Sequence, residues 1–337
     1  MTNVSSGPST RAMVVDVHAH ILPTDLIEAL NRRRHNGFPD IRSDGALAFG
    51  ERVTPVPPRD LTDVDQRLRD MNRMGVAMQI VSPWVELSPD GSGPGASDFL
   101  RLLNGAIAAE VGRHPTRLRG LGLVSRRDPE EATLEMIRVA RTRGMVGVEI
   151  TAGGTGPALH DGSWDRFWYT ASELGCLVLL HPWRAGCQAG VEVAGVGDIV
   201  DNPAQTSATV TALLLAGVIQ RYQGLNLCLV HGGGSLPYHL GRLTALGEPL
   251  RATQSASVAS GVRRLWFDSL THSSDALAFL AQQVGADRVL LGTDYPFPTG
   301  DSEGVSRVRG ARGLSADGKA AILGGNAIRL IRRLDTL

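Results

Sequence analysis

The sequence predicts an α/β fold, a (β/α)8 TIM barrel with a small insertion after its first strand. Eight short apolar segments alternate with segments of helical periodicity, a pattern typical of a parallel sheet. The chain has 337 residues, which is within the range of a single eight-stranded barrel. A doubly wound open sheet is the alternative, but no GxGxxG or GxxxxGK[ST] motif follows the first strand. We therefore expect a closed barrel.

Each element follows from local composition and spacing. The expected strands are 14–20, 76–81, 118–124, 146–150, 176–180, 225–230, 265–267 and 288–291. The expected helices are 61–74, 97–113, 129–143, 164–174, 203–222, 276–284 and 316–334. Residues 23–60 read as a long, polar and irregular insertion that builds a lid or pocket wall. We expect residues 1–12 to be a disordered tail and residues 13–337 to form one metal-dependent barrel domain.

Composition excludes several classes of protein. The 34 basic side chains (Lys plus Arg) balance 34 acidic ones, so no net field favours nucleic acid or a membrane surface. The three cysteines contain no CxxC pair, which favours a reducing compartment. No apolar run is long enough to span a membrane, and the first twelve residues lack the apolar core of a signal peptide. We expect a soluble, cytoplasmic protein.

The first expected strand ends in two histidines, His18 and His20, within the segment VVDVHAH. Residues at positions i and i+2 of a strand project from the same face. Two imidazoles that converge at the end of a buried strand are suited to metal binding. Taken alone, the pair could equally be ordinary polar residues that end a strand.

Later strands end in further residues that can bind metal, namely His181, His231, Asp268 and Asp294. In a parallel barrel the carboxyl ends of all strands lie on one rim, where active sites form. One such histidine is usually a satisfied core or loop residue. Packing does not require so many titratable groups on one rim, and burying them without partners costs free energy. The pattern therefore favours a metal site.

The motifs HAHILP, HPW, HGGG, GTDYPFP and GNA together resemble the amidohydrolase superfamily. More closely, the chain is similar to the aminocarboxymuconate-semialdehyde decarboxylase-like branch from Val14 to about Leu334. The resemblance implies one divalent metal per chain, zinc with manganese as the alternative. It implies His18, His20, His181 and Asp294 as ligands and His231 as the catalytic acid/base, with Asp294 also counted as catalytic.

The resemblance also implies residues that bind a small-molecule carboxylate. Arg242 matches an arginine that reaches a substrate carboxylate across a dimer interface, so a homodimer is expected. Arg52 matches a second arginine that binds carboxylate, and Phe297 matches an aromatic residue of the pocket. Trp183 and Arg184 follow the HP of the HPW motif and complete the expected substrate-binding set. Without the resemblance, Arg242 would be an ordinary helix-surface charge and Arg52 a loop charge.

Three positions depart from the pattern of the branch. Arg184 replaces an aspartate, Asp198 replaces a tryptophan at equal loop length, and Glu149 replaces a neutral residue inside a strand. Glu149 either adds an acid near the metal or is hydrogen-bonded inside the barrel. These changes leave the metal chemistry intact and leave the substrate open.

The expected function is non-oxidative decarboxylation of an unsaturated or aromatic carboxylic acid by metal-bound hydroxide with His231 as acid/base. The first alternative is a metal-dependent hydrolase of a lactone or amide on the same barrel. The second is a barrel that binds metal but has lost catalysis and serves as a scaffold. The presence of every ligand and of His231 counts against the scaffold.

Overall fold

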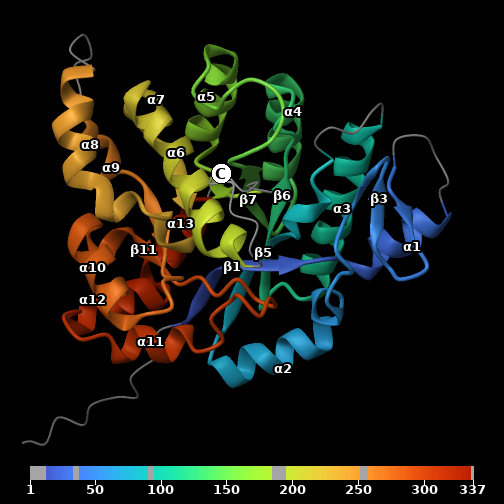
Figure 1. Ribbon diagram of the computed structural model, residues 1–337. Coiled ribbons are helices and arrows are strands. Elements are labelled where there is room, and N and C mark those ends of the chain that lie inside the picture. The colour runs from blue at the N-terminus through green and yellow to red at the C-terminus, as the bar shows by residue number, and fades with distance from the viewer. Residues whose placement is uncertain (1–12, 33–37, 90–94, 184–194, 251–256, 335–337) are drawn as a thin grey trace, which may run out of the picture.

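The computed structural model describes residues 13–32, 38–89, 95–183, 195–250 and 257–334. Eight strands form one parallel sheet in the order β1-β5-β6-β7-β8-β9-β10-β11, and helices lie around its outside (Figure 1). The strand order follows the chain, as successive right-handed βαβ units require. The predicted barrel is therefore confirmed, and the predicted tail at residues 1–12 lies outside the described residues.

The barrel strands lie within two residues of their predicted bounds. They are β1 (Val15–Ile21), β5 (Met78–Pro83), β6 (Leu118–Leu123), β7 (Met145–Thr151), β8 (Leu177–His181), β9 (Asn226–Leu229), β10 (Trp266–Asp268) and β11 (Val289–Leu290). Nearly every residue of these strands is buried, which explains their continuous apolar character.

Several helices begin at a capping side chain, and α2 is an example. Asp63 accepts a hydrogen bond from the backbone N–H of Gln66 at the start of α2, and Gly75 ends that helix in the left-handed conformation. The single helix predicted over 203–222 is two helices, because Gly217 adopts a φ of 73° between them.

The helices are α2 (Val64–Met74), α3 (Ala96–Arg113), α4 (Pro129–Ala140), α5 (Asp165–Leu174), α6 (Asn202–Leu215), α7 (Val218–Arg221), α8 (Leu236–Leu250), α9 (Val258–Val262), α10 (Ser274–Val284), α11 (Gly304–Gly310), α12 (Ala316–Ala320) and α13 (Asn326–Leu334). None of the described helices is long and apolar enough to cross a membrane.

The insertion after β1 is more regular than predicted. It contains the helix α1 (Thr24–Arg32) and a three-stranded antiparallel sheet of β2 (Asp40–Ile41), β3 (Leu47–Phe49) and β4 (Arg52–Val53). Both lie beside α3 in Figure 1, and the Phe49 ring packs edge-on against Phe99 of α3 at 5.4 Å between centroids. The prediction of an irregular loop was wrong for the described part of this segment, because its buried apolar residues dock on α3.

The interior of the barrel is apolar toward the amino-terminal ends of the strands. Val15, Val17, Leu121 and Leu179 belong to a cluster that also contains residues near the strand starts, such as Met78 and Leu177. Ala327, Leu330 and Ile331 of α13 join the same cluster. The last helix therefore closes this end of the barrel, and the opposite end is left for a site.

The barrel closes between β11 and β1 through the segment that carries the metal-competent residues. The backbone N–H groups of Thr293 and Asp294 donate to the carbonyl of His18 at 3.2 and 2.7 Å. The buried Asp16 carboxylate accepts from the N–H and the hydroxyl of Thr293 and from the Gln79 amide. These bonds fix the Asp294 loop against the strand that bears His18 and His20.

Candidate metal centre

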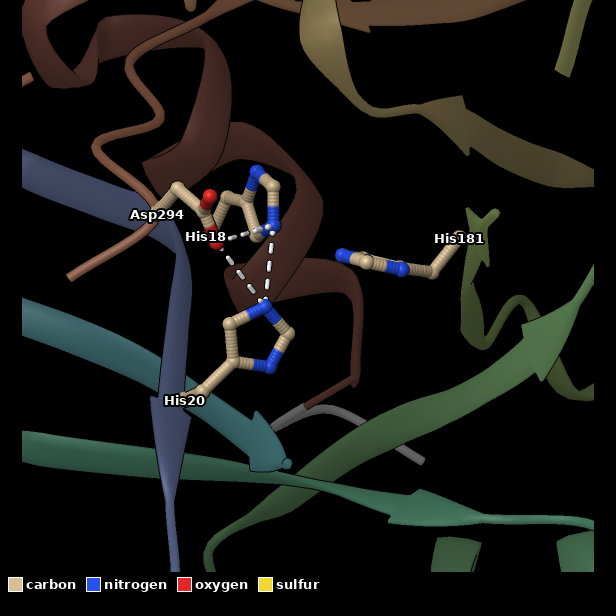
Figure 2. Close-up of side chains that lie close together, drawn as sticks. All are labelled: His18, His20, His181 and Asp294. Atoms are coloured by element: carbon tan, nitrogen blue, oxygen red, sulfur yellow. Dashed lines mark hydrogen bonds and ion pairs between the residues drawn. The ribbon is translucent and has the colours of Figure 1, made fainter. Parts of the chain in front are cut away.

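Three histidines and one aspartate converge at the carboxyl ends of three strands (Figure 2). His18 and His20 lie on β1, His181 ends β8, and Asp294 follows β11. The Nε2 atoms of His18 and His20 are 3.2 Å apart and lie 3.4 and 3.1 Å from Asp294 Oδ1. All four ligand atoms lie within 4.8 Å of one another. Bonds of about 2.0–2.1 Å to one tetrahedral metal place ligand atoms about 3.3–3.4 Å apart, which matches the separations among His18, His20 and Asp294.

The hydrogen bonds of the three imidazoles leave the Nε2 atoms for a metal. The Nδ1 atoms contact Asp268 Oδ2 at 2.7 Å for His18, the Pro83 carbonyl at 3.0 Å for His20 and the Pro182 carbonyl at 2.6 Å for His181. Such partners fix the tautomer and orientation of ligand histidines. The buried Nε2 atom of His181 has no hydrogen-bond partner among the described residues. Because a buried nitrogen is costly to leave unpaired, this donor set fits a metal ion.

The pKa shifts of Asp294 and His181 also suit a metal. Burial opposes ionisation of Asp294, but His18, His20 and His231 outweigh it and hold the pKa of this carboxyl well below its usual value. Burial, reinforced by the neighbouring histidines, lowers the pKa of His181 well below its usual value. At neutral pH the centre therefore offers a carboxylate and an uncharged imidazole, which are the protonation states of metal ligands.

His231 lies beside the four ligands without joining them. Its Nε2 atom is 3.9 Å from Asp294 Oδ2, and its ring centroid is 5.4 Å from those of His18 and His181. Burial lowers the pKa of His231, but the carboxylates of Asp294 and Asp268 outweigh it and the net shift is upward. The side chain is 21% exposed, so this imidazole can exchange a proton with a molecule above the metal ligands.

A cavity of about 1000 Å³ opens above the cluster. His20, His181 and Asp294 form part of its floor, and His231 lies in its wall. Apolar side chains make up much of the remaining lining, among them Trp84, Leu270, Leu280 and Phe297. A volume of this size accommodates a small organic molecule.

Of the substrate-binding residues that the resemblance implies, the structure places only some in the lining of the cavity. Phe297 lines the cavity, and its ring centroid is 5.5 Å from that of His20. Trp183 is buried, and its ring lies 5.6 Å from the guanidinium carbon of Arg52. Arg242 is exposed on α8, and Arg184 lies outside the described residues. Neither Arg52 nor Arg242 belongs to the cavity lining.

Arg52 is held by the protein itself. Its guanidinium donates to the backbone carbonyls of Glu86 and Ser88 and lies 3.6 Å from a Glu86 carboxylate oxygen. It also lies 4.2 Å above the centre of the Phe49 ring. Contact between this arginine and a substrate carboxylate therefore stays a prediction.

Two acids whose roles the sequence analysis left open, Asp268 and Glu149, lie beside the metal-binding set. Asp268, noted only as a residue at a strand end, orients His18 and also accepts from the N–H groups of Gly232 and Leu270 at 2.7 and 3.1 Å. Glu149 is fully buried with Oε2 4.0 Å from Nδ1 of His20, so it is an acid beside the metal-binding set. Burial raises its pKa to about 7. The position of Asp268 at the end of β10 was the available signal for its role.

Known proteins show the same architecture. A 5-carboxyvanillate decarboxylase from Sphingomonas paucimobilis matches with a TM-score of 0.75 at 23% identity, over 96% of this chain and 99% of that one. A dihydroxybenzoic acid decarboxylase from Polaromonas sp. JS666, solved with bound manganese and the inhibitor 2-nitroresorcinol, matches with a TM-score of 0.73 at 20% identity, over 96% and 97%.

Sequence comparison agrees with the fold. The chain is 28% identical over 330 residues to a 2-amino-3-carboxymuconate-6-semialdehyde decarboxylase from Dictyostelium discoideum, which covers 95% of this chain and 92% of the relative. The amidohydrolase family model matches residues 15–333, almost the whole length. With the metal-binding cluster at the carboxyl ends of its strands, the chain belongs to the amidohydrolase family.

Proposed function

We propose that the protein is a metal-dependent, non-oxidative decarboxylase of an unsaturated or aromatic carboxylic acid. The observation that carries the proposal is the position of His231, a proton-exchanging group beside a set of three imidazoles and one carboxylate, under an open cavity. The named activities of the relatives from Dictyostelium, Sphingomonas and Polaromonas support the same reaction class.

His18, His20, His181 and Asp294 would hold one divalent metal. The metal supplies Lewis acidity, which stabilises negative charge on a substrate and lowers the pKa of a coordinated water. We propose zinc, because three imidazoles and a carboxylate are ligands that zinc accepts. Manganese is the alternative, because the Polaromonas relative was solved with it.

His231 would handle the proton of the reaction. His231 donates a proton to the carbon that bears the leaving carboxylate, and π electrons of the substrate form the new C–H bond. The bond to the carboxylate then breaks, its electron pair returns to the π system, carbon dioxide leaves, and solvent restores the proton of His231. An ordinary imidazole titrates near neutral pH, so a histidine is suited to give and take this proton.

The cavity walls suit a flat, unsaturated molecule. The rings of Trp84 and Phe297 lie 6.4 Å apart in the lining, and Phe297 also contacts His20. Apolar aromatic walls bind a planar π system and exclude water from the reacting carbon. In this proposal Trp183 supports the wall from its buried position.

The remaining parts of the proposal rest on the resemblance alone. Arg52, Arg184 and Arg242 are proposed to contact carboxylates of the substrate, with Arg242 acting in the partner copy of a homodimer. A cytoplasmic location also stays a prediction. Replacement of a substrate-binding arginine should raise KM with little change in kcat.

The proposal is tested by supplying zinc-loaded protein with three acids and measuring carbon dioxide. The acids are 2-amino-3-carboxymuconate 6-semialdehyde, 2,6-dihydroxybenzoate and 5-carboxyvanillate. We expect release from at least one of them, and we expect a chelator to abolish it. Hydrolysis of a parallel panel of neutral esters, amides and lactones, with no carbon dioxide from any acid, would favour the hydrolase and contradict the proposal.

A further inference from the structure

Arg52 and Arg242 do not line the cavity, so recognition of an acidic substrate within it calls for a further group. Among its described lining residues there is no arginine or lysine, and Glu86 and Asp198 contribute acidic side chains. His20 and His181 belong to the metal-binding set, and His231 has the position of the proton donor. Apart from these three, His272 is the one described lining residue that can carry a positive charge.

The backbone conformation of His272 resembles that of the two residues nearest the chemistry. Three non-glycine residues of the described chain have a positive φ: His231 at 55°, His272 at 55° and Asp294 at 57°. All three line the same cavity. Side chains larger than glycine adopt this conformation uncommonly, and such residues cluster at functional sites. Two of these residues already have places in the proposed reaction, and His272 has none.

The loop that carries His272 is fixed on both sides of it. Asp268 accepts from the N–H of Leu270, and the Thr271 hydroxyl donates to the carbonyl of Ser273 at 3.0 Å. The Ser273 hydroxyl in turn accepts from the N–H of Ala276 at the start of α10. The same Asp268 carboxylate orients His18 and binds the N–H of Gly232, so this loop is joined to the metal centre.

The imidazole of His272 has no role in holding this loop. It is exposed, and it makes no hydrogen bond or ion pair within the described part of the chain. The metal ligands, by contrast, are buried at the floor of the cavity. His272 therefore lines the cavity apart from the buried metal-binding set.

We propose that His272 binds a second carboxylate of the substrate, remote from the carboxylate that reacts at the metal. The inference rests on the proposed function, since it assigns the recognition of an acidic substrate to the same cavity. The imidazole N–H would donate to a carboxylate oxygen, which is stronger than a bond between neutral groups. The substrate class is therefore an unsaturated or aromatic dicarboxylate.

The experiment compares the binding of isophthalate and benzoate, two rigid rings that differ by one carboxylate. Isothermal titration calorimetry of the zinc-loaded protein reads binding without turnover. We expect the wild-type protein to bind isophthalate about tenfold more tightly than benzoate, because a hydrogen bond to a charged group contributes at least that factor in affinity. The His272→Asn variant should reduce the preference to less than threefold, with benzoate affinity and zinc content unchanged. Asparagine tolerates a positive φ, so the loop should keep its conformation.

His160→Asn is the matched control, since His160 is an exposed histidine outside the cavity lining. It should keep the preference of the wild-type protein. Absence of a preference in the wild-type protein, or full retention of it in His272→Asn, would overturn the inference. Isophthalate recognition that depends on His272, together with no carbon dioxide from any acid, would keep the inference and reject the decarboxylase instead.

Discussion

The floor and the mouth of the cavity are built differently. The floor, made of His18, His20, His181 and Asp294, is buried, and three of its ring nitrogens are held by Asp268 or by backbone carbonyls. At the mouth, apolar side chains are open to solvent: Val56 is 55% exposed, Ile199 77% and Tyr238 80%.

The difference follows from the elements that carry each region. Floor residues lie at the ends of barrel strands, and backbone hydrogen bonds join His18 of β1 to the segment after β11, so neighbouring backbone fixes their positions. Mouth residues come from the insertion after β1, the π-helical turn Gly197–Asp201 and the helix α8, which are connections at the surface. The floor is therefore suited to fixed chemistry, and the mouth to variation in the substrate.

The largest expected effect is the loss of kcat on replacement of His231. Replacement of His231 by glutamine removes the proton donor without removing a metal ligand, so kcat should fall by about 10²–10⁴-fold. KM and zinc content should change little. Steady-state kinetics and metal analysis of the same preparations make the measurement. Loss of zinc together with activity would instead place His231 among the ligands.

Next in size is the effect of Asp268→Asn on metal affinity. The two carboxylate oxygens accept from His18 on one side and from the N–H groups of Gly232 and Leu270 on the other. An asparagine has one acceptor oxygen, so either His18 or the N–H groups of Gly232 and Leu270 would face the amide NH2 group, which cannot accept their hydrogen bonds. We expect zinc affinity to fall by about 10–100-fold in competition with a chromophoric chelator.

Asp165→Asn is the control for that variant. Asp165 pairs with Arg221 at the surface, and the exposed pair contributes little to stability. Equal zinc affinity in both variants and the wild-type protein would contradict the orienting role of Asp268.

A smaller effect, on the pH dependence of the free energy of unfolding, is expected from Glu149→Gln in protein stripped of metal. Burial raises the pKa of Glu149 from 4.5 to about 7, so the folded state binds a proton that the unfolded state has released. The stability that this group contributes is present below pH 4.5 and is lost as the pH rises to about 7. Glutamine does not ionise, so the variant should gain about 2 kcal/mol over the wild-type protein between pH 5 and pH 8.

Urea unfolding at the two pH values measures this difference, with Glu173→Gln as an exposed control on α5. A gain for Glu149→Gln that is the same at pH 5 and pH 8 would mean that Glu149 is already ionised in the folded protein.

The smallest effects, on stability and on kcat, are expected from a substitution at the mouth of the cavity. Ile199→Ser alters an exposed side chain, so the free energy of unfolding should change by less than about 0.5 kcal/mol. The zinc content should stay the same, and kcat should change by less than about twofold, while KM shifts with the substrate. A tenfold loss of kcat would show that the mouth takes part in the chemistry and would remove the contrast with the floor.

The contrast also explains what the sequence could predict. His18, His20, His181 and Asp294 each end or follow an apolar run, so parallel-barrel geometry was enough to bring them together. The roles of Asp268 and Glu149 depend on which ring nitrogen each carboxylate approaches, and no spacing in the chain contains that information.

The surface segments were harder to predict. The sheet formed by β2, β3 and β4 is held in place where Phe49 packs on Phe99 of α3, about 50 residues later in the chain. Arg52 was expected at a substrate, but its contacts with Glu86 and Ser88 come from the segment after β5. Such long-range contacts leave little periodicity in a short, polar insertion.

The central claim is that the floor of the cavity performs metal-dependent decarboxylation. The most direct test follows the ultraviolet absorbance of 2-amino-3-carboxymuconate 6-semialdehyde with zinc-loaded, chelator-stripped and zinc-restored protein, beside the ligand variant His181→Ala. We expect decay and carbon dioxide release with zinc, loss of both on stripping, recovery on restoration and no activity in the variant. Equal decay with stripped protein or with the variant would contradict it.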